Sequence, residues 1–317
     1  MSEFRTELPY QPLLTVVVAT YNREKILERC LRSLTEQEAD PTQFEVLVVE
    51  NRCTDGTVAL AQRYCSSFSH FKLIHEPNQG LSYSRNQGLK NARGAFVGYI
   101  DDDAEAPKSW VSETLKAIEK FPHAVAFGGP YVPYYLDGPP SWFRDGFASW
   151  NPGGGIRDFG KKDCFCGSNM VIQRRLLEEL GGFAVDLGHC GTKKVYGEES
   201  DLHSKIKTRG LPTLFIPDMV VRHLAKPALY SAKYLIKDSF QAGINAGEIG
   251  LLGRSKSLAF AKVLATLALA PYYTFFNVDP SLKTRLLFTA RPLARRAGYL
   301  RGLFRPPHRS ANSGSSS

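Results

Sequence analysis

Residues 95–103 read Ala-Phe-Val-Gly-Tyr-Ile-Asp-Asp-Asp, an apolar run that ends in three carboxylates. The run predicts a buried strand, and carboxylates this close together repel one another and raise each other's pKa. A divalent cation removes that repulsion, and oxygen ligands favour Mg²⁺ or Mn²⁺ over zinc. Ligands of α/β proteins also gather beyond the carboxyl ends of sheet strands. The segment therefore predicts a metal site, with an acidic cap on the following helix as the alternative.

Strands and helices are predicted to alternate on both sides of this segment. Short β-branched or apolar runs indicate strands at 13–19, 44–49, 71–75 and 95–100. Apolar residues at helical spacing, or a turn signal before them, indicate helices at 23–37, 57–65, 81–90 and 109–120. This alternation is typical of a three-layer α/β fold with a mostly parallel central sheet.

The alternation breaks after a further strand at 124–128. Residues 130–162 are rich in Gly, Pro and aromatic side chains, including Trp142 and Trp150. Loops this long are usually functional lids or disordered, and disordered segments rarely hold so many aromatics. We therefore expect an ordered functional loop. Regular structure should return as strands at 169–172, 213–216 and 219–223 and as helices at 174–180, from Glu198, and at 230–247.

The positive charge of the chain is concentrated at its C-terminal end. From Ser281 onward there are eight basic residues and no acidic ones, whereas the other 32 basic residues are nearly balanced by 31 acidic ones. The body therefore offers no general nucleic-acid-binding surface. The tail is expected to be attracted to something anionic.

The basic tail follows an apolar segment, 257–276, that contains Lys262 and Pro271. Its uncharged part is shorter than the roughly 20 residues of a spanning helix. A helix pair in a membrane interface is the favoured interpretation, and a helix packed on the core is the alternative. We expect one large domain at 1–253, a segment at 254–309 held on an anionic membrane surface by its cations, and a disordered tail at 310–317.

The six cysteines form no C-x-x-C pair, and Cys30 falls on the apolar stripe of a predicted helix. We expect the reduced thiols of a cytosolic protein, since Cys164 and Cys166 near His189 fit no standard zinc spacing. The polar residues 1–11 show no signal-peptide pattern. The chain is therefore predicted to be cytoplasmic and peripheral on the inner face of the cell membrane.

Seven groups of short motifs follow one another along the chain: LLTVVVATYNR (13–23), VVEN (48–51) with DGT (55–57), NQG (78–80) with SRNQG (84–88), DDD (101–103), GGF (181–183), GEESDL (197–202) and His223. Each is weak alone, but in this order, over about Leu13 to Gly247, they resemble the family 2 glycosyltransferases of the GT-A fold. The resemblance implies a metal-dependent, inverting enzyme. It would move a sugar from a nucleotide-diphosphate donor, a UDP-sugar being favoured, to an acceptor hydroxyl in polysaccharide or glycolipid synthesis.

The resemblance also implies roles in the donor site. Tyr21 is expected to pack on the base beside backbone groups of Ala19. Glu50, where the family usually has Asp, is expected to accept a hydrogen bond from the base, and Arg85, near a helix start, to bind the diphosphate. The structural alternatives are a helix-entry staple for Tyr21, an acid near a helix N-cap for Glu50 and a solvated surface arginine for Arg85.

In the family the Asp triplet works as a D-x-D motif. Asp103 is expected to bind Mn²⁺ or Mg²⁺, with His223 completing the metal shell. Asp101 is expected to reach the ribose or a metal-bound water, and Asp102 is counted with the donor-binding residues. A histidine at a strand end is also often structural, which is the alternative for His223.

The general base is expected at the head of the helix that opens at Glu198. Glu199 occupies the position where inverting family members carry Asp, and Asp201 is the fallback. Acids at a helix start also stabilise the helix by ~0.3–1 kcal/mol each, a structural role that is compatible with catalysis. No second nucleophile is evident, which favours a single displacement with inversion.

Other classes of protein fit less well. A dinucleotide-dependent oxidoreductase would carry G-x-G-x-x-G directly after its first strand, whereas this chain has Ala-Thr-Tyr-Asn-Arg at 19–23. A non-catalytic, membrane-associated protein that binds nucleotide-sugars on a transferase-like fold remains open, although Asp101, Asp103 and Glu199 together favour an enzyme. The acceptor, saccharide or lipid-linked, is expected to meet the aromatic loop through Trp142 and Trp150.

Overall fold

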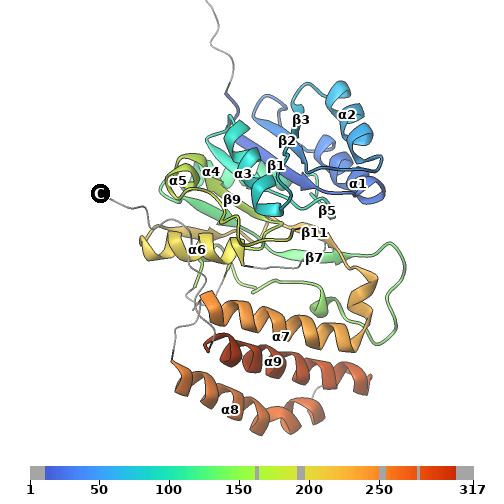
Figure 1. Cartoon of the computed structure of the whole chain (residues 1–317), viewed down its shortest axis with the longest axis vertical. Coiled ribbons are helices and arrows are strands. Elements are labelled where there is room, and N and C mark those ends of the chain that lie inside the picture. The colour runs from blue at the N-terminus through green and yellow to red at the C-terminus, as the bar shows by residue number, and fades with distance from the viewer. Residues whose placement is uncertain (1–10, 161–163, 191–196, 250–254, 277–278, 305–317) are drawn as a thin grey trace, which may run out of the picture.

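The computed structural model describes residues 11–160, 164–190, 197–249, 255–276 and 279–304. An α/β body carries the active-site loops, and three long helices lie beneath it in Figure 1. The expected disordered tail at 310–317 and most of the polar segment at 1–11 lie outside the described residues.

The body is built on an eight-stranded sheet in the order β3-β2-β1-β4-β9-β6-β10-β8. The first four strands are parallel, β9 runs antiparallel to both of its neighbours, β10 is parallel to β6, and the edge strand β8 is antiparallel. Their bounds are β1 Leu14–Thr20, β2 Phe44–Glu50, β3 Phe71–His75, β4 Phe96–Tyr99, β6 Ala126–Gly128, β8 Arg157–Asp158, β9 Met170–Gln173 and β10 Thr213–Phe215. The mostly parallel sheet is confirmed.

Helices cover both faces of this sheet, because β1 and β2 are apolar on both of their faces. Val16 and Val18 pack with Leu31 of α1 on one side, whereas Val17 packs with Leu89 of α3 on the other. The helices of the body are α1 Glu24–Thr35, α2 Thr57–Ser67, α3 Leu81–Asn91, α4 Trp110–Lys120, α5 Arg174–Glu179 and α6 Glu198–Thr208. The predicted three-layer fold is therefore the one observed.

A second sheet of three short strands crosses the end of the first. β11 (Val221–Leu224) pairs with β5 (Ala104–Glu105) and with β7 (Tyr131–Tyr134). The sequence did not predict β5, β7 or β8, and the expected loop at 130–162 contains β7, β8 and the 3₁₀ helix η1 (Asp145–Phe147). Strands of two to four residues, one of them containing Pro133, are too short to show a period of two. This second sheet is what brings β11 to the acidic loop.

The C-terminal helices form a layered stack. After η2 (Pro227–Tyr230) come α7 (Ala232–Ile249), α8 (Lys256–Phe275) and α9 (Leu282–Gly302), and α9 lies between α7 and α8 (Figure 1). The expected choice between an interfacial and a packed helix for 257–276, which is α8, stays a prediction. No helix among the described residues is long and apolar enough to cross a bilayer.

The cations of the tail are less free than the sequence implied. Four of the six that are described contact the protein itself. Lys283 lies over the ring of Trp142, Arg291 donates to Ser239, Arg296 donates to the carbonyl of Lys262, and Arg301 lies over Phe240. Three of these four contacts join α9 to α7 or α8, although Lys283, Arg296 and Arg301 stay exposed.

Candidate active site

The acidic loop lies at the edge of the sheet where the parallel strands β1, β2 and β4 end. Thr20 and Glu50 are register partners at the ends of β1 and β2, and β4 runs alongside β1 up to Tyr99. Asp101 to Asp103 follow β4 directly. The acidic triplet therefore lies at the carboxyl edge of the sheet, and the expected site there stays a prediction.

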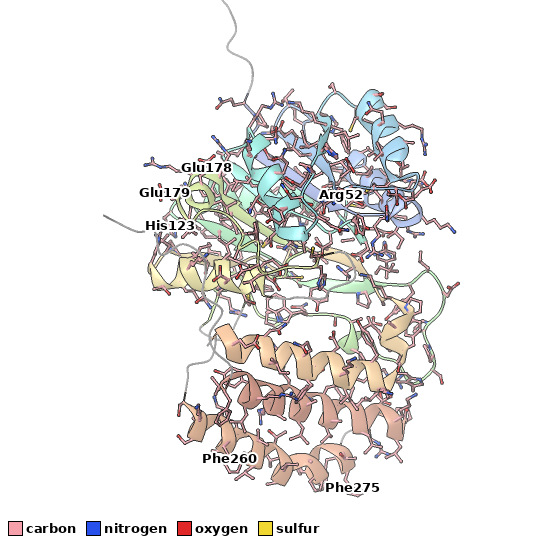
Figure 2. All side chains as sticks on the ribbon, in the orientation of Figure 1. Arg52, His123, Glu178, Glu179, Phe260 and Phe275 are labelled. Carbon is pink, nitrogen blue, oxygen red and sulfur yellow. The ribbon has the colours of Figure 1, made fainter. Side chains whose placement is uncertain are left out.

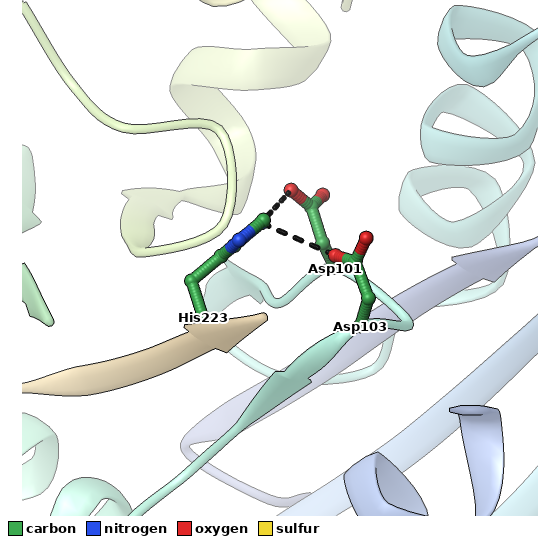
Figure 3. Close-up of side chains that lie close together, drawn as sticks. All are labelled: Asp101, Asp103 and His223. Atoms are coloured by element: carbon green, nitrogen blue, oxygen red, sulfur yellow. Dashed lines mark ion pairs between the residues drawn. The ribbon is translucent and has the colours of Figure 1, made fainter. Parts of the chain in front are cut away.

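Three residues of this edge could hold a metal ion together. One ligand atom each from Asp101, Asp103 and His223 lies within 4.8 Å of the other two. Figure 3 shows the ring of His223 on β11 pointing toward both carboxylates. Its Nε2 is 3.2 Å from Oδ1 of Asp103 and 3.5 Å from Oδ2 of Asp101. Two carboxylates and one imidazole form a donor set that suits Mn²⁺ or Mg²⁺.

The titration of these groups reflects their mutual charges. Burial raises the pKa of Asp101, but a hydrogen bond from His223 and the charge of Arg85 outweigh it and hold that pKa below its usual value. Burial lowers the pKa of His223, and the two carboxylates more than reverse this. Burial and the charge of Asp103 raise the pKa of Asp102 to about 7. The pKa shifts of these three groups therefore arise from burial and from charges that lie close together.

The sequence reasoning missed Lys226. Its Nζ lies 2.5 Å from Oδ2 of Asp103, so that His223 and Lys226 each approach one oxygen of the same carboxylate. The one signal in the sequence is that Lys226 follows His223 by three residues. A second missed cation, Arg23, lies 3.8 Å from Asp102.

Arg85 is buried, so the alternative of a solvated surface arginine is wrong. It is 2% exposed, and its guanidinium donates to Glu198 at 2.9 Å, to the carbonyl of Gly167 at 3.1 Å and to Asp101 at 3.2 Å. Arg85 therefore joins the acidic loop after β4 to the head of α6. Its expected contact with a diphosphate stays a prediction.

The head of α6 presents the candidate base. Glu198 is buried against Arg85, whereas Glu199 is half-buried. Burial and the charge of Glu198 raise the pKa of Glu199 well above its ordinary value, although the charge of Arg85 opposes them. Asp201 is paired with Lys205 at 2.7 Å. In this turn the pKa of Glu199 is raised, whereas Asp201 is paired with a cation; the role of either as a base stays a prediction.

The expected base-binding residues lie at the ends of β1 and β2. Ala19 is within β1, and Tyr21 follows it with 38% of its surface exposed. Glu50 is buried; it accepts a hydrogen bond from the backbone N–H of Cys53 at 3.1 Å and contacts the ring of His75. The three residues share one edge, as predicted, and their roles toward a donor stay predictions.

The two tryptophans of the aromatic loop are held by packing. Trp142 lies in a small apolar cluster with Phe143 and Phe147. Trp150 forms a backbone bridge with Tyr131, and its ring stacks on Phe159. Both rings are only partly exposed. Their expected contact with an acceptor is untested by these contacts, which assign each ring a role in packing.

The six cysteines are free in the structure. Within the described part of the chain, Asp101, Asp103 and His223 form the single group of three or more residues arranged to hold a metal ion.

The chain is similar in sequence to known glycosyltransferases. The family described as Glycosyl transferase family 2 matches residues 15–181. A glucosyl-dolichyl phosphate glucuronosyltransferase of Haloferax volcanii is 28% identical over 92% of this chain and 97% of its own length. Glycosyltransferase AglE of the same organism is 23% identical over 93% of this chain and 97% of its own.

Solved structures share the fold. A mannosyltransferase from Pyrobaculum calidifontis, in complex with GDP-Man and Mn²⁺, superposes with a TM-score of 0.55 and 22% identity. It covers 91% of this chain, which spans 74% of that protein. S. aureus TarS 1–349, in complex with UDP, has a TM-score of 0.54 and 19% identity, covering 90% and 89% of the two chains. At these identities the likeness concerns the fold.

Proposed function

The chain belongs to glycosyl transferase family 2, and we propose that it transfers a sugar from a nucleotide-diphosphate donor to an acceptor hydroxyl with inversion, using Mn²⁺ or Mg²⁺. That it is a glycosyltransferase follows from the family and from its relatives. The proposal of mechanism is supported above all by one arrangement. A carboxylate–carboxylate–histidine group and a carboxylate with a raised pKa lie on either side of Arg85.

The donor would lie across the carboxyl ends of β1, β2 and β4. Tyr21 would pack on the base and Glu50 would accept its N–H, with a UDP-sugar as the favoured donor. Asp101, Asp103 and His223 would hold the cation, which supplies charge neutralisation for the departing diphosphate. Asp102 and Arg85 would complete the donor side of the site.

Glu199 would accept the proton of the acceptor hydroxyl. Burial and the charge of Glu198 raise its pKa, which makes its ionised form a stronger base. Since only the ionised carboxylate acts as base, kcat/KM should fall as the pH drops through this raised pKa. The acid limb should therefore lie above the range of an unperturbed glutamate, which has a pKa of about 4.3.

The acceptor is proposed to be a lipid-linked saccharide. One relative that this chain matches over nearly its full length is named a glucosyl-dolichyl phosphate glucuronosyltransferase. A polysaccharide end is the second candidate, since another relative is named for succinoglycan biosynthesis. Trp142 and Trp150 would border the acceptor. We further propose a transferase domain at 1–253 and a segment at 254–309 that keeps the protein peripheral on the inner face of the cell membrane.

Donor hydrolysis tests the proposal directly. The full-length protein should release nucleoside diphosphate from one of a set of UDP-, GDP- and TDP-sugars, and only with Mn²⁺ or Mg²⁺. Asp103→Ala should abolish the metal-dependent release, whereas Glu113→Ala, a surface acid paired with Lys116, should retain it. Release that is indifferent to metal and to Asp103→Ala would exclude the metal assignment. Tight donor binding without any turnover would instead favour the non-catalytic alternative.

A further inference from the structure

The outermost helix, α8, buries two small residues and leaves most of its large apolar residues exposed. Ala259 and Thr266 are buried against the neighbouring helix, and Thr266 is contacted by Arg296 of α9. The large side chains of α8 are about half exposed or more: Leu258, Phe260, Leu264, Leu267, Leu269, Tyr272 and Phe275. We call these seven the outer face of α8. Figure 2 shows Phe260 and Phe275 along the outer edge of the molecule.

This arrangement is the reverse of a helix on a water-soluble protein, whose large apolar residues face the core. It is typical of helices in lipid, where small residues form the contacts between helices. The contact between α7 and α9 follows the same rule. A Cβ added at Gly243 or Gly247 of α7, or at Gly298 or Gly302 of α9, would approach a backbone oxygen of the partner helix to between 2.0 and 2.4 Å.

The charges around the outer face of α8 favour an anionic lipid surface over a second copy of the chain as its partner. Among residues 255–304, Asp279 is the one acidic residue. Arg144 binds it through two hydrogen bonds of 2.6 and 3.0 Å, and its side chain is only 12% exposed. Lys256 and Lys283 are exposed. A second copy of the chain would bring these cations against one another, whereas an anionic lipid surface complements them.

We propose that the outer face of α8 inserts into the boundary between headgroups and acyl chains of an anionic bilayer. This inference rests on the proposed function, which places the enzyme at a membrane, and it names the surface that makes the contact. It also changes the physical cause expected from the sequence. The exposed apolar face of α8 supplies attraction of its own, and exposed cations such as Lys256 and Lys283 add to it.

Vesicle sedimentation of the full-length protein tests the proposal, with phosphatidylcholine vesicles that do or do not contain phosphatidylglycerol. The double variant Phe260→Glu/Phe275→Glu should lower recovery with the anionic vesicles by at least about tenfold, because a charge on the inserted face must be dehydrated. Ile156→Glu/Val185→Glu is the matched control. It adds the same charge at two apolar residues of the body that are 44% and 49% exposed, and its recovery should stay within about twofold of the parent chain.

Three outcomes would overturn the proposal. Equal recovery of both double variants would remove the outer face from the contact. Complete release at about 0.5 M NaCl, where exposed charges are screened, would make the attraction electrostatic. In analytical ultracentrifugation, the parent chain could be a dimer and Phe260→Glu/Phe275→Glu a monomer. If the variant also bound vesicles as well as the parent chain does, the occupant of the outer face would be a second copy of the chain. Donor hydrolysis without vesicles should be equal in all three proteins, so a failure of the proposed chemistry is seen separately.

Discussion

Replacing Arg85 by methionine should destabilise the protein more than any surface substitution. The guanidinium is 2% exposed and donates to Glu198, to Asp101 and to the carbonyl of Gly167. Glu198 has a side chain that is 7% exposed, so Arg85→Met leaves its carboxylate buried without a cation, whereas Asp101, 31% exposed, keeps contact with solvent. Removing one partner of a buried ion pair costs about 3–5 kcal/mol. We expect a loss of that size in the free energy of unfolding.

Two further variants test whether the loss of stability comes from the burial of the ion pair or from ion pairing alone. Arg29 donates to Glu105 at 2.8 Å, but its side chain is 49% exposed, so Arg29→Met should cost no more than about 1 kcal/mol. Arg85→Met/Glu198→Leu should recover most of the loss, because an apolar replacement for a whole buried pair is often close to neutral. Urea unfolding followed by tryptophan fluorescence measures all three. The reasoning fails if Arg85→Met costs no more than Arg29→Met, or if the double variant is as unstable as Arg85→Met.

The same substitution should move the pH profile. Burial and the charge of Glu198 raise the pKa of Glu199, and the charge of Arg85 lowers it. Without Arg85 the protonated form of Glu199 persists to higher pH, so the acid limb of kcat/KM should shift upward. Initial rates are to be measured at a temperature at which the variant is folded. If the acid limb of the pH profile stayed at the same pH or moved to lower pH, Glu199 would not be the group that controls it.

Three other predictions concern separate parts of the molecule. Glu199→Gln keeps the size of the side chain but removes its basicity, so turnover should fall ~10²–10⁴-fold with donor affinity nearly unchanged; equal turnover in a steady-state transfer assay would remove Glu199 from the chemistry. Lys226→Met removes a cation 2.5 Å from Asp103, so Mn²⁺ should bind the donor-free protein about tenfold more tightly if ~1.4 kcal/mol of repulsion is lost; calorimetric titration that gives weaker binding would contradict this. Gly298→Val would drive a Cβ to 2.0 Å from a backbone carbonyl of α7 and should cost at least about 1–3 kcal/mol, whereas Gly138→Ala, with nothing within 4 Å, should be nearly neutral by thermal unfolding.

The body of the protein was predictable because its signals are local and repeated. The strand at 44–49 and the helix at 57–65 differ from β2 and α2 by one or two residues at one end. The position of the acidic triplet at the carboxyl edge of the sheet was predictable too, since parallel strands bring their carboxyl ends together. The second sheet was not predictable, because β5 has two residues and β7 contains a proline. Its partner β11 nevertheless decides where His223 lies.

What the sequence could not supply is the identity of the partners that polar residues find across the fold. Arg85 lies near a helix start, and that local fact pointed to phosphate. In the structure the guanidinium of Arg85 also donates to Glu198, which lies 113 residues further along the chain. The same limit applied to the basic tail. Its cations were predicted to be free, because the sequence does not say which face α9 turns toward α7 and α8. Local chemistry thus identified the residues that carry charge, whereas the fold determines whether that charge meets a substrate, a membrane or another side chain.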